Sequence, residues 1–373
     1  MAQKIILDCD PGIDDALAIA FAVGHPGLEL CGITTVAGNV GLDLTTSNAQ
    51  QVCEFIGAAG IPVTPGSPAP LLRPLMDARR VHGDTGLGGV RLPPPMARPS
   101  GGHAIDFLIE TIGAAPGEIT LVATGPLTNI ALAVHREPRL VSQVRDFVIM
   151  GGSAGRGNVT PATEFNIATD PEAAAIVFRA GWTVTMVGLD VTLQARATPA
   201  VRDRMRLLGP LADELLLPGL ERYATDADPL PALPKADGRA AEGDPEAAGH
   251  AARHTAGPAV QAASHPARPA AQPAGHPAGL ATQAAAQQSG RGPGGPPVHD
   301  VCAVAHVANA GLLGCVPARV EVETIGRWTS GMTVTDFRPT TAEHNALVAT
   351  EIDVSAFWEL VLDAYARLAA TMS

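Results

Sequence analysis

Near its start the chain reads Ile5-Ile6-Leu7-Asp8-Cys9-Asp10-Pro11-Gly12-Ile13-Asp14-Asp15-Ala16-Leu17-Ala18-Ile19. An apolar strand stops at Asp8, Pro11 and Gly12 turn the chain, and an apolar helix begins near Asp15. Open α/β sheets hold their ligands where a strand ends and a helix starts. The four carboxylates of this stretch repel one another, and a bound cation relieves that repulsion. Because carboxylate oxygens are hard ligands, the stretch predicts a Ca²⁺ or Mg²⁺ site.

Apolar strand-like and helix-like segments alternate along most of the chain. This alternation predicts an α/β fold with an open, mostly parallel, Rossmann-like sheet and helices on both faces. Asp170-Pro171-Glu172 supplies an N-cap, a first-turn proline and a first-turn acid, so another helix follows it. We expect strands at 3–7, 28–36, 118–124, 144–150, 183–189, 319–324, 332–337 and 346–352, and helices at 15–23, 42–56, 103–112, 126–135, 300–308 and 357–368.

The alternation fails from about Thr225 to Pro297. This segment is rich in Ala, Pro, Gly and Gln and contains no Phe, Tyr or Trp. Such a composition cannot bury enough apolar area to offset the entropy of ordering the chain. We therefore expect one domain, residues 1–373, interrupted by a low-complexity, disordered insertion at about 225–297.

Composition narrows the class of protein. Hydrophobic residues make up 46% of the chain, so we expect a globular body, and the net charge of -12 argues against nucleic acid as a partner. The start of the chain lacks a signal-peptide pattern, and no apolar stretch has transmembrane length. No cysteine stands in a CxxC pair, so we expect buried free thiols in a cytoplasmic protein. The five cysteines are Cys9, Cys31, Cys53, Cys302 and Cys315.

The opening motif resembles the DxDPGxDD signature of the inosine-uridine-preferring nucleoside N-ribohydrolases. Further blocks resemble that family in order and spacing, and together they cover nearly all of the chain outside the insertion. These blocks are Thr35-Val36-Ala37-Gly38-Asn39-Val40, His82-Gly83-Asp84-Thr85-Gly86-Leu87-Gly88-Gly89, Ala123-Thr124-Gly125-Pro126-Leu127-Thr128-Asn129, Met150-Gly151-Gly152, Gly157-Asn158, Glu164-Phe165-Asn166, Asp170-Pro171-Glu172-Ala173-Ala174 and Val298-His299-Asp300-Val301-Cys302-Ala303.

The resemblance implies a Ca²⁺-dependent hydrolase that splits ribonucleosides into ribose and a free base. Asp10, Asp15, Asp300 and the backbone carbonyl of Thr124 would bind the ion, whose shell the ribose 2′- and 3′-hydroxyls and a water complete. Asp10 would also take a proton from the attacking water. Asp8 receives no role. The family is commonly homodimeric or homotetrameric, so a homo-oligomer is expected.

The resemblance also implies a sugar pocket. Residues for the ribose diol are Asp14, Asn39 and Asn166, those for the 5′-hydroxyl are Asn158 and Glu164, and Met150 lines the pocket. Taken singly, each has a simpler interpretation, since Asn stabilises turns and Glu164 could be a solvated surface acid. All of them follow predicted strands, at the ligand edge of the sheet.

The leaving base needs a proton donor or a stabilising partner, and histidine titrates in a suitable range. His299, beside Asp300, is the first candidate and His82 the second, although either could be an ordinary loop residue. Tyr223 and Trp328 could contact the base or simply pack.

Two other classes of function compete with the hydrolase. A haloacid-dehalogenase-like Mg²⁺ phosphatase also carries an aspartate pair after its first strand, here Asp8 and Asp10. It needs a hydroxyl two residues after the second aspartate, where this chain has Gly12. A non-catalytic nucleoside- or ribose-binding protein would keep the pocket without turnover, but it would have no need of Asp10.

Overall fold

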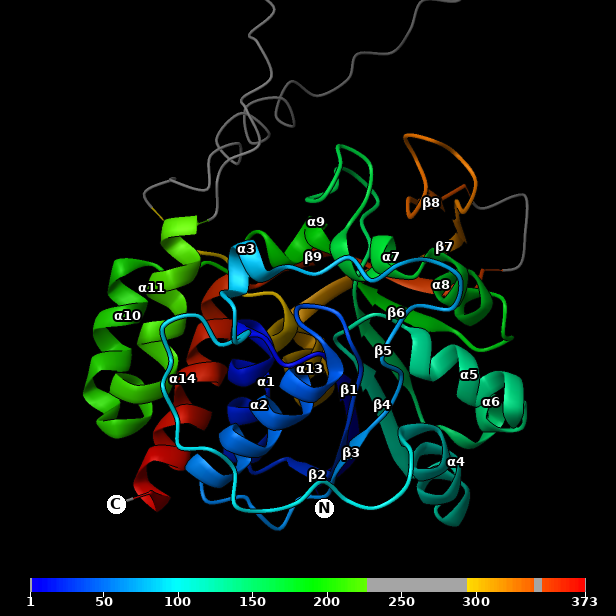
Figure 1. Ribbon diagram of the computed structural model, residues 1–373. Helices are drawn as coiled ribbons and strands as arrows, with labels where there is room; N and C mark the ends of the chain where they lie inside the picture. The colour runs from blue at the N-terminus through cyan, green and yellow to red at the C-terminus, as the bar shows by residue number, and fades with distance from the viewer. Residues whose placement is uncertain (1, 227–293, 339–343, 373) are drawn as a thin grey trace, which may run out of the picture. The chain divides into compact units, whose positions relative to one another are not determined.

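The computed structural model describes residues 2–226, 294–338 and 344–372 (Figure 1). Most of the predicted insertion therefore lies outside the described residues. Its predicted limits of 225 and 297 are too wide, because both flanks belong to the fold. Helix α11 (Leu217–Asp226) includes Thr225, and Pro297 forms an isolated antiparallel bridge with Arg196.

In the described part of the chain the sheet has nine strands, in the order β3-β2-β1-β4-β5-β6-β9-β7-β8. The strands from β3 to β9 in this order are parallel, and β7 and β8 each run antiparallel to their neighbours. The predicted mostly parallel α/β fold is confirmed. The strands are β1 (Gln3–Cys9), β2 (Leu28–Thr35), β3 (Val63–Pro65), β4 (Ile119–Ala123), β5 (Phe147–Met150), β6 (Val184–Val187), β7 (Leu313–Val322), β8 (Thr333–Asp336) and β9 (Ala346–Ile352).

Strand β1 lies at the point where the strand order reverses. The chain runs from β1 outward to β2 and β3, and then returns to place β4 on the other side of β1. Asp8 at the end of β1 is paired with Thr34 of β2 and with Ala123 of β4. Parallel sheets open a crevice at such a reversal, at the carboxyl ends of the strands. The loops after β1, β2 and β4 therefore meet at one place.

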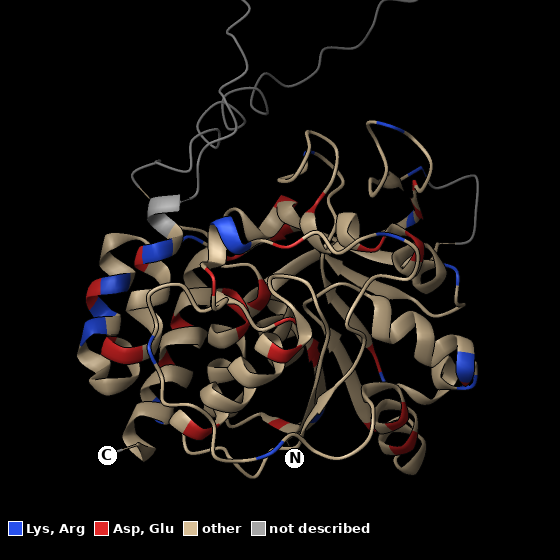
Figure 2. Ribbon diagram, viewed as in Figure 1, with Lys and Arg blue, Asp and Glu red and all other residues tan. Residues whose placement is uncertain are grey.

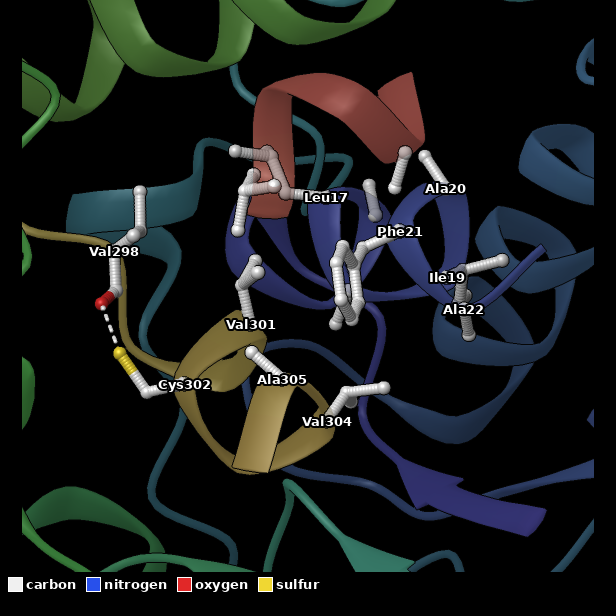
Figure 3. Packing of buried hydrophobic residues seen from close by; sticks show 14 of the residues in the cluster. Leu17, Ile19, Ala20, Phe21, Ala22, Val298, Val301, Cys302, Val304 and Ala305 are labelled. Atoms are coloured by element: carbon white, nitrogen blue, oxygen red, sulfur yellow. Dashed lines mark hydrogen bonds between the residues drawn. The ribbon is translucent and has the colours of Figure 1, made fainter. Parts of the chain in front are cut away.

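Helices cover both faces of the sheet, as predicted (Figure 1). Along β1 the side chains alternate, so that Ile5, Leu7 and Cys9 join the core under α1 and α13, while Ile6 joins the core under α4, α5 and α8. Figure 3 shows α1 packed against α13. One face carries α1 (Ile13–Gly24), α2 (Leu42–Phe55), α13 (Asp300–Ala308) and α14 (Val354–Thr371), and the other α4 (Ala104–Ala114), α5 (Thr128–Arg136), α6 (Leu140–Gln143) and α8 (Pro171–Phe178).

Some elements differ from the predicted ones. Strand β7 begins at Leu313, six residues before the predicted 319–324, because Gly314 and Pro317 look like strand breakers in sequence. Short elements near the strand ends were not predicted. These are β3, α3 (Arg79–His82), α7 (Phe165–Thr169), α9 (Leu189–Thr192), α10 (Pro199–Met205) and a π-helix at Leu211–Leu216 that continues into α11.

The structure also bears on the expectations about buried cysteines and about membrane-spanning segments. Cys9, Cys53 and Cys302 are buried free thiols, as expected, whereas Cys31 and Cys315 are only half-buried. Within the described residues, none of the helices combines the length and the apolar character that a membrane span needs.

Candidate active site

Asp15 links the start of α1 to the end of β4. Its Oδ2 accepts a hydrogen bond from the backbone N–H of Gly12 at 3.0 Å, which caps the helix. Its Oδ1 accepts one from the Thr124 hydroxyl at 2.8 Å. Capping alone thus explains only one of the four aspartates, and even this one reaches across to a second strand end.

Asp10 follows β1 directly and is almost completely buried. The backbone N–H of Asn39 donates to its Oδ2 at 2.6 Å, while its Oδ1 has no hydrogen-bond partner. A Cβ atom on Gly38 would lie 2.1 Å from Oδ2, and one on Gly125 would lie 2.7 Å from Oδ1. Glycine is therefore required at both positions, because the backbone itself forms the walls around this carboxylate.

Asn166 and Glu164 hold the loop after β5. The Asn166 side-chain amide donates to the backbone carbonyls of Thr124, at 2.8 Å, and of Met150, at 3.0 Å. Glu164 is the N-cap of α7 and accepts backbone N–H groups of Gly152, Asn166 and Ile167. The alternative interpretation of Glu164 as a solvated surface acid is wrong, because it is buried.

The carboxyl groups influence one another electrostatically. Burial raises the pKa of Asp10 and of Asp300 well above the usual range, and the charge of Asp15 raises both further. Burial raises the pKa of Asp14 to about 8, with Asp15 again contributing. Burial also raises the pKa of Glu164. Acidic residues thus lie inside the fold where α1 and α13 begin, whereas Lys and Arg lie mostly on outer helices and loops (Figure 2).

The buried carboxylates and the Thr124 carbonyl offer oxygen ligands, which is the chemistry that a hard cation prefers. Within residues 2–226, 294–338 and 344–372, no group of three or more His, Cys, Asp or Glu side chains is already arranged to hold a metal ion. However, buried oxygens Asp10 Oδ1 and Asp14 Oδ1 lack hydrogen-bond partners, and buried anions need a proton or a cation. The predicted ligands Asp10, Asp15, Thr124 and Asp300 are all buried here and offer only oxygen.

Two histidines and a tyrosine form a row of rings beside the carboxylates. The ring of Tyr223 lies 5.8 Å from that of His82 and 6.2 Å from that of His299. The backbone N–H of Ile13 donates to His82 Nδ1, which places the proton of the neutral ring on Nε2. Thr192 hydrogen-bonds His299 Nδ1. Burial lowers the pKa of His82 to about 3 and that of His299 to about 4, so both rings are neutral near pH 7.

Tyr223 reaches this row from α11. Its hydroxyl hydrogen-bonds the Asp14 carboxylate, which the His299 backbone N–H also contacts. A Cβ on Gly88 would lie 2.9 Å from Arg222, so the glycine-rich loop at residues 83–89 packs closely against α11. The π-helix before α11 is accounted for by Pro218, which cannot donate a backbone hydrogen bond to the preceding turn.

Asn158, Trp328 and Asp8 lie apart from this arrangement. Asn158 is exposed, and its Oδ1 accepts the Phe165 backbone N–H. Trp328 is 75% exposed, with the Arg327 guanidinium 4.8 Å from its ring centre. Asp8 points to the opposite face of the sheet and bonds Asn129, a contact that the sequence analysis missed. The only sequence signal for it was the position of Asn129 soon after a strand.

Known proteins resemble this chain over nearly its whole length. The family model described as "Inosine-uridine preferring nucleoside hydrolase" matches residues 5–359. An inosine-uridine preferring nucleoside hydrolase from Leishmania major is 39% identical, with 99% of each chain covered. The pyrimidine-specific ribonucleoside hydrolase RihB of Escherichia coli O157:H7 is 47% identical over 57% of this chain and 68% of its own.

Solved structures of nucleoside hydrolases also resemble this chain. A purine-preferring ribonucleoside hydrolase from Gardnerella vaginalis has a TM-score of 0.77 and 28% identity, with 99% of this chain and 100% of that one covered. A plant nucleoside hydrolase, PpNRh1, also has a TM-score of 0.77, with 27% identity and 98% and 99% coverage. With its fold, its buried carboxylates and these relatives, the chain belongs to the inosine-uridine preferring nucleoside hydrolase family.

Proposed function

We propose that this enzyme hydrolyses the N-glycosidic bond of ribonucleosides with Asp10 as the base that activates water. Family membership supports the ribonucleoside reaction itself. The observation that carries the mechanism is the buried, unpartnered Oδ1 of Asp10 at the strand reversal. This oxygen is an acceptor that no group of the described chain uses, and a reacting water can occupy its hydrogen-bonding position.

The reaction needs a negative environment around the sugar. As the bond from C1′ to the base nitrogen breaks, positive charge builds on the ribose, as in glycoside hydrolysis. A bound cation would keep Asp14 and Asp300 ionised, and these buried carboxylates would then stabilise the charge electrostatically. The water oxygen bonds to C1′, Asp10 accepts the water proton, and the electron pair of the broken bond leaves with the base, which takes up a proton.

Asp10, Asp15, Asp300 and the Thr124 carbonyl are the proposed ligands of a Ca²⁺ ion. When bound, Ca²⁺ would accept six to eight oxygen ligands in a flexible arrangement, which suits a diol and a water, and it would lower the pKa of that water. Asp15 is already oriented by Gly12 and Thr124. Asn166 orients the Thr124 carbonyl, and its bond leaves that oxygen a second lone pair.

The ring row of His82, Tyr223 and His299 is the proposed contact for the leaving base. Because both histidines are neutral, they would act as hydrogen-bond donors to the charge that develops on the base. His82 is fixed with its proton on Nε2, and His299 is oriented through Nδ1 by Thr192. Such second bonds keep a ring in one orientation.

Substrates with different leaving groups test this role. Replacing His82 or His299 with Asn is expected to lower kcat on a natural ribonucleoside by about 100-fold or more, because one hydrogen-bond donor to a developing negative charge typically contributes that much. The leaving group of 4-nitrophenyl riboside is 4-nitrophenolate, which departs without taking up a proton. With this substrate, kcat of the same variants should stay within about threefold of the wild type. If every variant lost activity equally on both substrates, the ring row would have no part in leaving-group departure.

A panel of nucleosides tests the proposed function itself. We expect reducing sugar to be released from at least one of inosine, adenosine, uridine and cytidine, and release to stop after exhaustive chelation and return with Ca²⁺. Binding without release would favour a nucleoside-binding protein. Full activity after chelation would remove the metal assignment. A phosphatase would instead release phosphate from phosphoesters, but Asp8 and Asp10 accept hydrogen bonds from different groups, Thr34 and Asn129 for Asp8 and Asn39 for Asp10.

A further inference from the structure

Asp8 lies at the centre of a fully buried polar cluster behind the carboxylate site. Its Oδ1 accepts the Thr34 hydroxyl at 2.5 Å and the Asn129 side-chain amide at 2.9 Å. Asn129 also donates to the Thr35 carbonyl at 3.0 Å and accepts the Ser67 backbone N–H at 2.8 Å. Asn129 therefore joins the ends of β1 and β2 to the segment after β3.

The packing around Asn129 leaves no spare room. A Cβ on Gly66 would lie 2.3 Å from Asn129 Oδ1 and 2.5 Å from its Nδ2. Close approach of this kind is possible only with glycine, so the segment after β3 is fitted against the amide. A buried amide whose oxygen and nitrogen are both hydrogen-bonded holds a single local arrangement.

Two connections lead from this cluster to the carboxylates. In the first, the Ser67 carbonyl accepts the Ala37 N–H at 3.0 Å, and the same loop presents the Asn39 N–H to Asp10. In the second, the Asp8 backbone carbonyl accepts the Thr124 N–H at 2.8 Å, and Thr124 in turn bonds Asp15. The first connection depends on the side chains of Asp8 and Asn129, whereas the second starts from the backbone of Asp8.

We propose that Asp8 and Asn129 are positioning residues that hold the 36–40 loop so that Asn39 fixes the Asp10 carboxylate. The expected effect on kcat rests on the proposed function, whereas the expected effect on the loop geometry does not. Asp8 itself does not touch the site, because its carboxylate lies on the α5 face of the sheet. Its Oδ2 has no hydrogen-bond partner, so only its Oδ1 is needed.

That asymmetry makes Asp8→Asn the informative variant. Asparagine keeps an acceptor oxygen for Thr34 and Asn129, and its amide nitrogen replaces the unpartnered Oδ2. We expect Asp8→Asn to keep kcat and KM within about threefold of the wild type, and Asp8→Ala and Asn129→Ala to lower kcat by about 100-fold, the typical cost of a misplaced reacting group. Equal losses in Asp8→Asn and Asp8→Ala would show that Asp8 acts through its charge and overturn the proposal.

Backbone hydrogen exchange measures how firmly the 36–40 loop is held, and it does so independently of enzymatic activity. In Asp8→Ala and Asn129→Ala, exchange in the peptide covering residues 36–41 should rise by about tenfold or more, since the loop loses its anchor. The peptide covering 123–127 should be unchanged in Asp8→Ala, because the backbone connection to Thr124 survives. Unchanged exchange at 36–41 would overturn the proposal even in an active enzyme, and a wild type without hydrolase activity would contradict only the proposed function.

Two further variants separate positioning from general stability. Asn345, just before β9, also makes three buried hydrogen bonds, to Phe178 and Val320, in the half of the sheet away from β2 and β3. Asn345→Ala should lower the melting temperature but leave kcat and exchange at 36–41 unchanged. If Asp8→Ala does not fold, Gly66→Ala disturbs Asn129 instead and should raise exchange at 36–41. Gly60→Ala, where a Cβ meets nothing within 4 Å, should not.

Discussion

Asp10→Asn is expected to lower kcat by about 10³-fold on the preferred ribonucleoside, within the range that a positioned general base contributes. Asparagine keeps an oxygen that can accept the Asn39 N–H, so the loop around it keeps its geometry. What it loses is the second carboxylate oxygen, which lies buried without a partner and can take a proton. The loss should appear in kcat, because the substrate still reaches an intact pocket.

The melting temperature shows whether this variant fails through unfolding. Without a bound cation, burial raises the pKa of Asp10 well above its usual range, so a neutral amide should be tolerated in the fold at least as well. Asp43→Asn is the matched control, since Asp43 is exposed in the first turn of α2 and should not affect kcat. Full activity in Asp10→Asn would mean that another group activates the water.

A 2′-deoxyribonucleoside is expected to have a kcat/KM about 10⁴-fold below that of the matching ribonucleoside. Sites built to hydrogen-bond a hydroxyl reject analogues that lack it by about this factor, because the polar groups are left unpaired. Asp14 Oδ1 is such a group, buried and without a partner in the described chain. Uridine and 2′-deoxyuridine can be compared directly in a reducing-sugar assay.

The 5′-deoxy analogue supplies the internal comparison. Glu164 already accepts three backbone N–H groups, and Asn158 is exposed, so loss of the 5′-hydroxyl leaves no buried group unpaired. We expect a decrease of about tenfold, equivalent to one ordinary hydrogen bond. Similar rates for the ribo and 2′-deoxy substrates would show that the buried carboxylates do not recognise the diol.

The sequence predicted the central layers of the fold well. The apolar runs of β1 and α1 are long and regular, so their existence and type followed from periodicity alone. Strand β3 has three residues and carries no periodic signal. The start of β7 was missed for another reason, which is the presence of Pro317. Proline is tolerated there because β8 pairs only with residues from Arg319 onward, so no strand on that side needs a backbone N–H from Pro317.

The candidate site was predictable as a set of residues but not as a set of contacts. The family resemblance implied that Asp10, Asp15 and Asp300 share one site, and all three are buried. The role of Glu164 as an N-cap depends on the path of the loop from Gly152, which the sequence does not reveal. The partner of Asp8 likewise depends on which face of β1 each side chain takes, and a shift of one residue would reverse it.

The order of the elements along the chain also determines when this protein acquires its site during synthesis. Asp10 and Asp15 emerge first, whereas Asp300 emerges roughly 15 to 60 seconds later at the usual speed of translation, about 5–20 residues per second. We therefore expect water to reach Asp10, Asp14 and Asp15 until α13 packs against α1, and their full dehydration to come with that docking step. A chain truncated before α13 carries its first four aspartates but lacks Asp300.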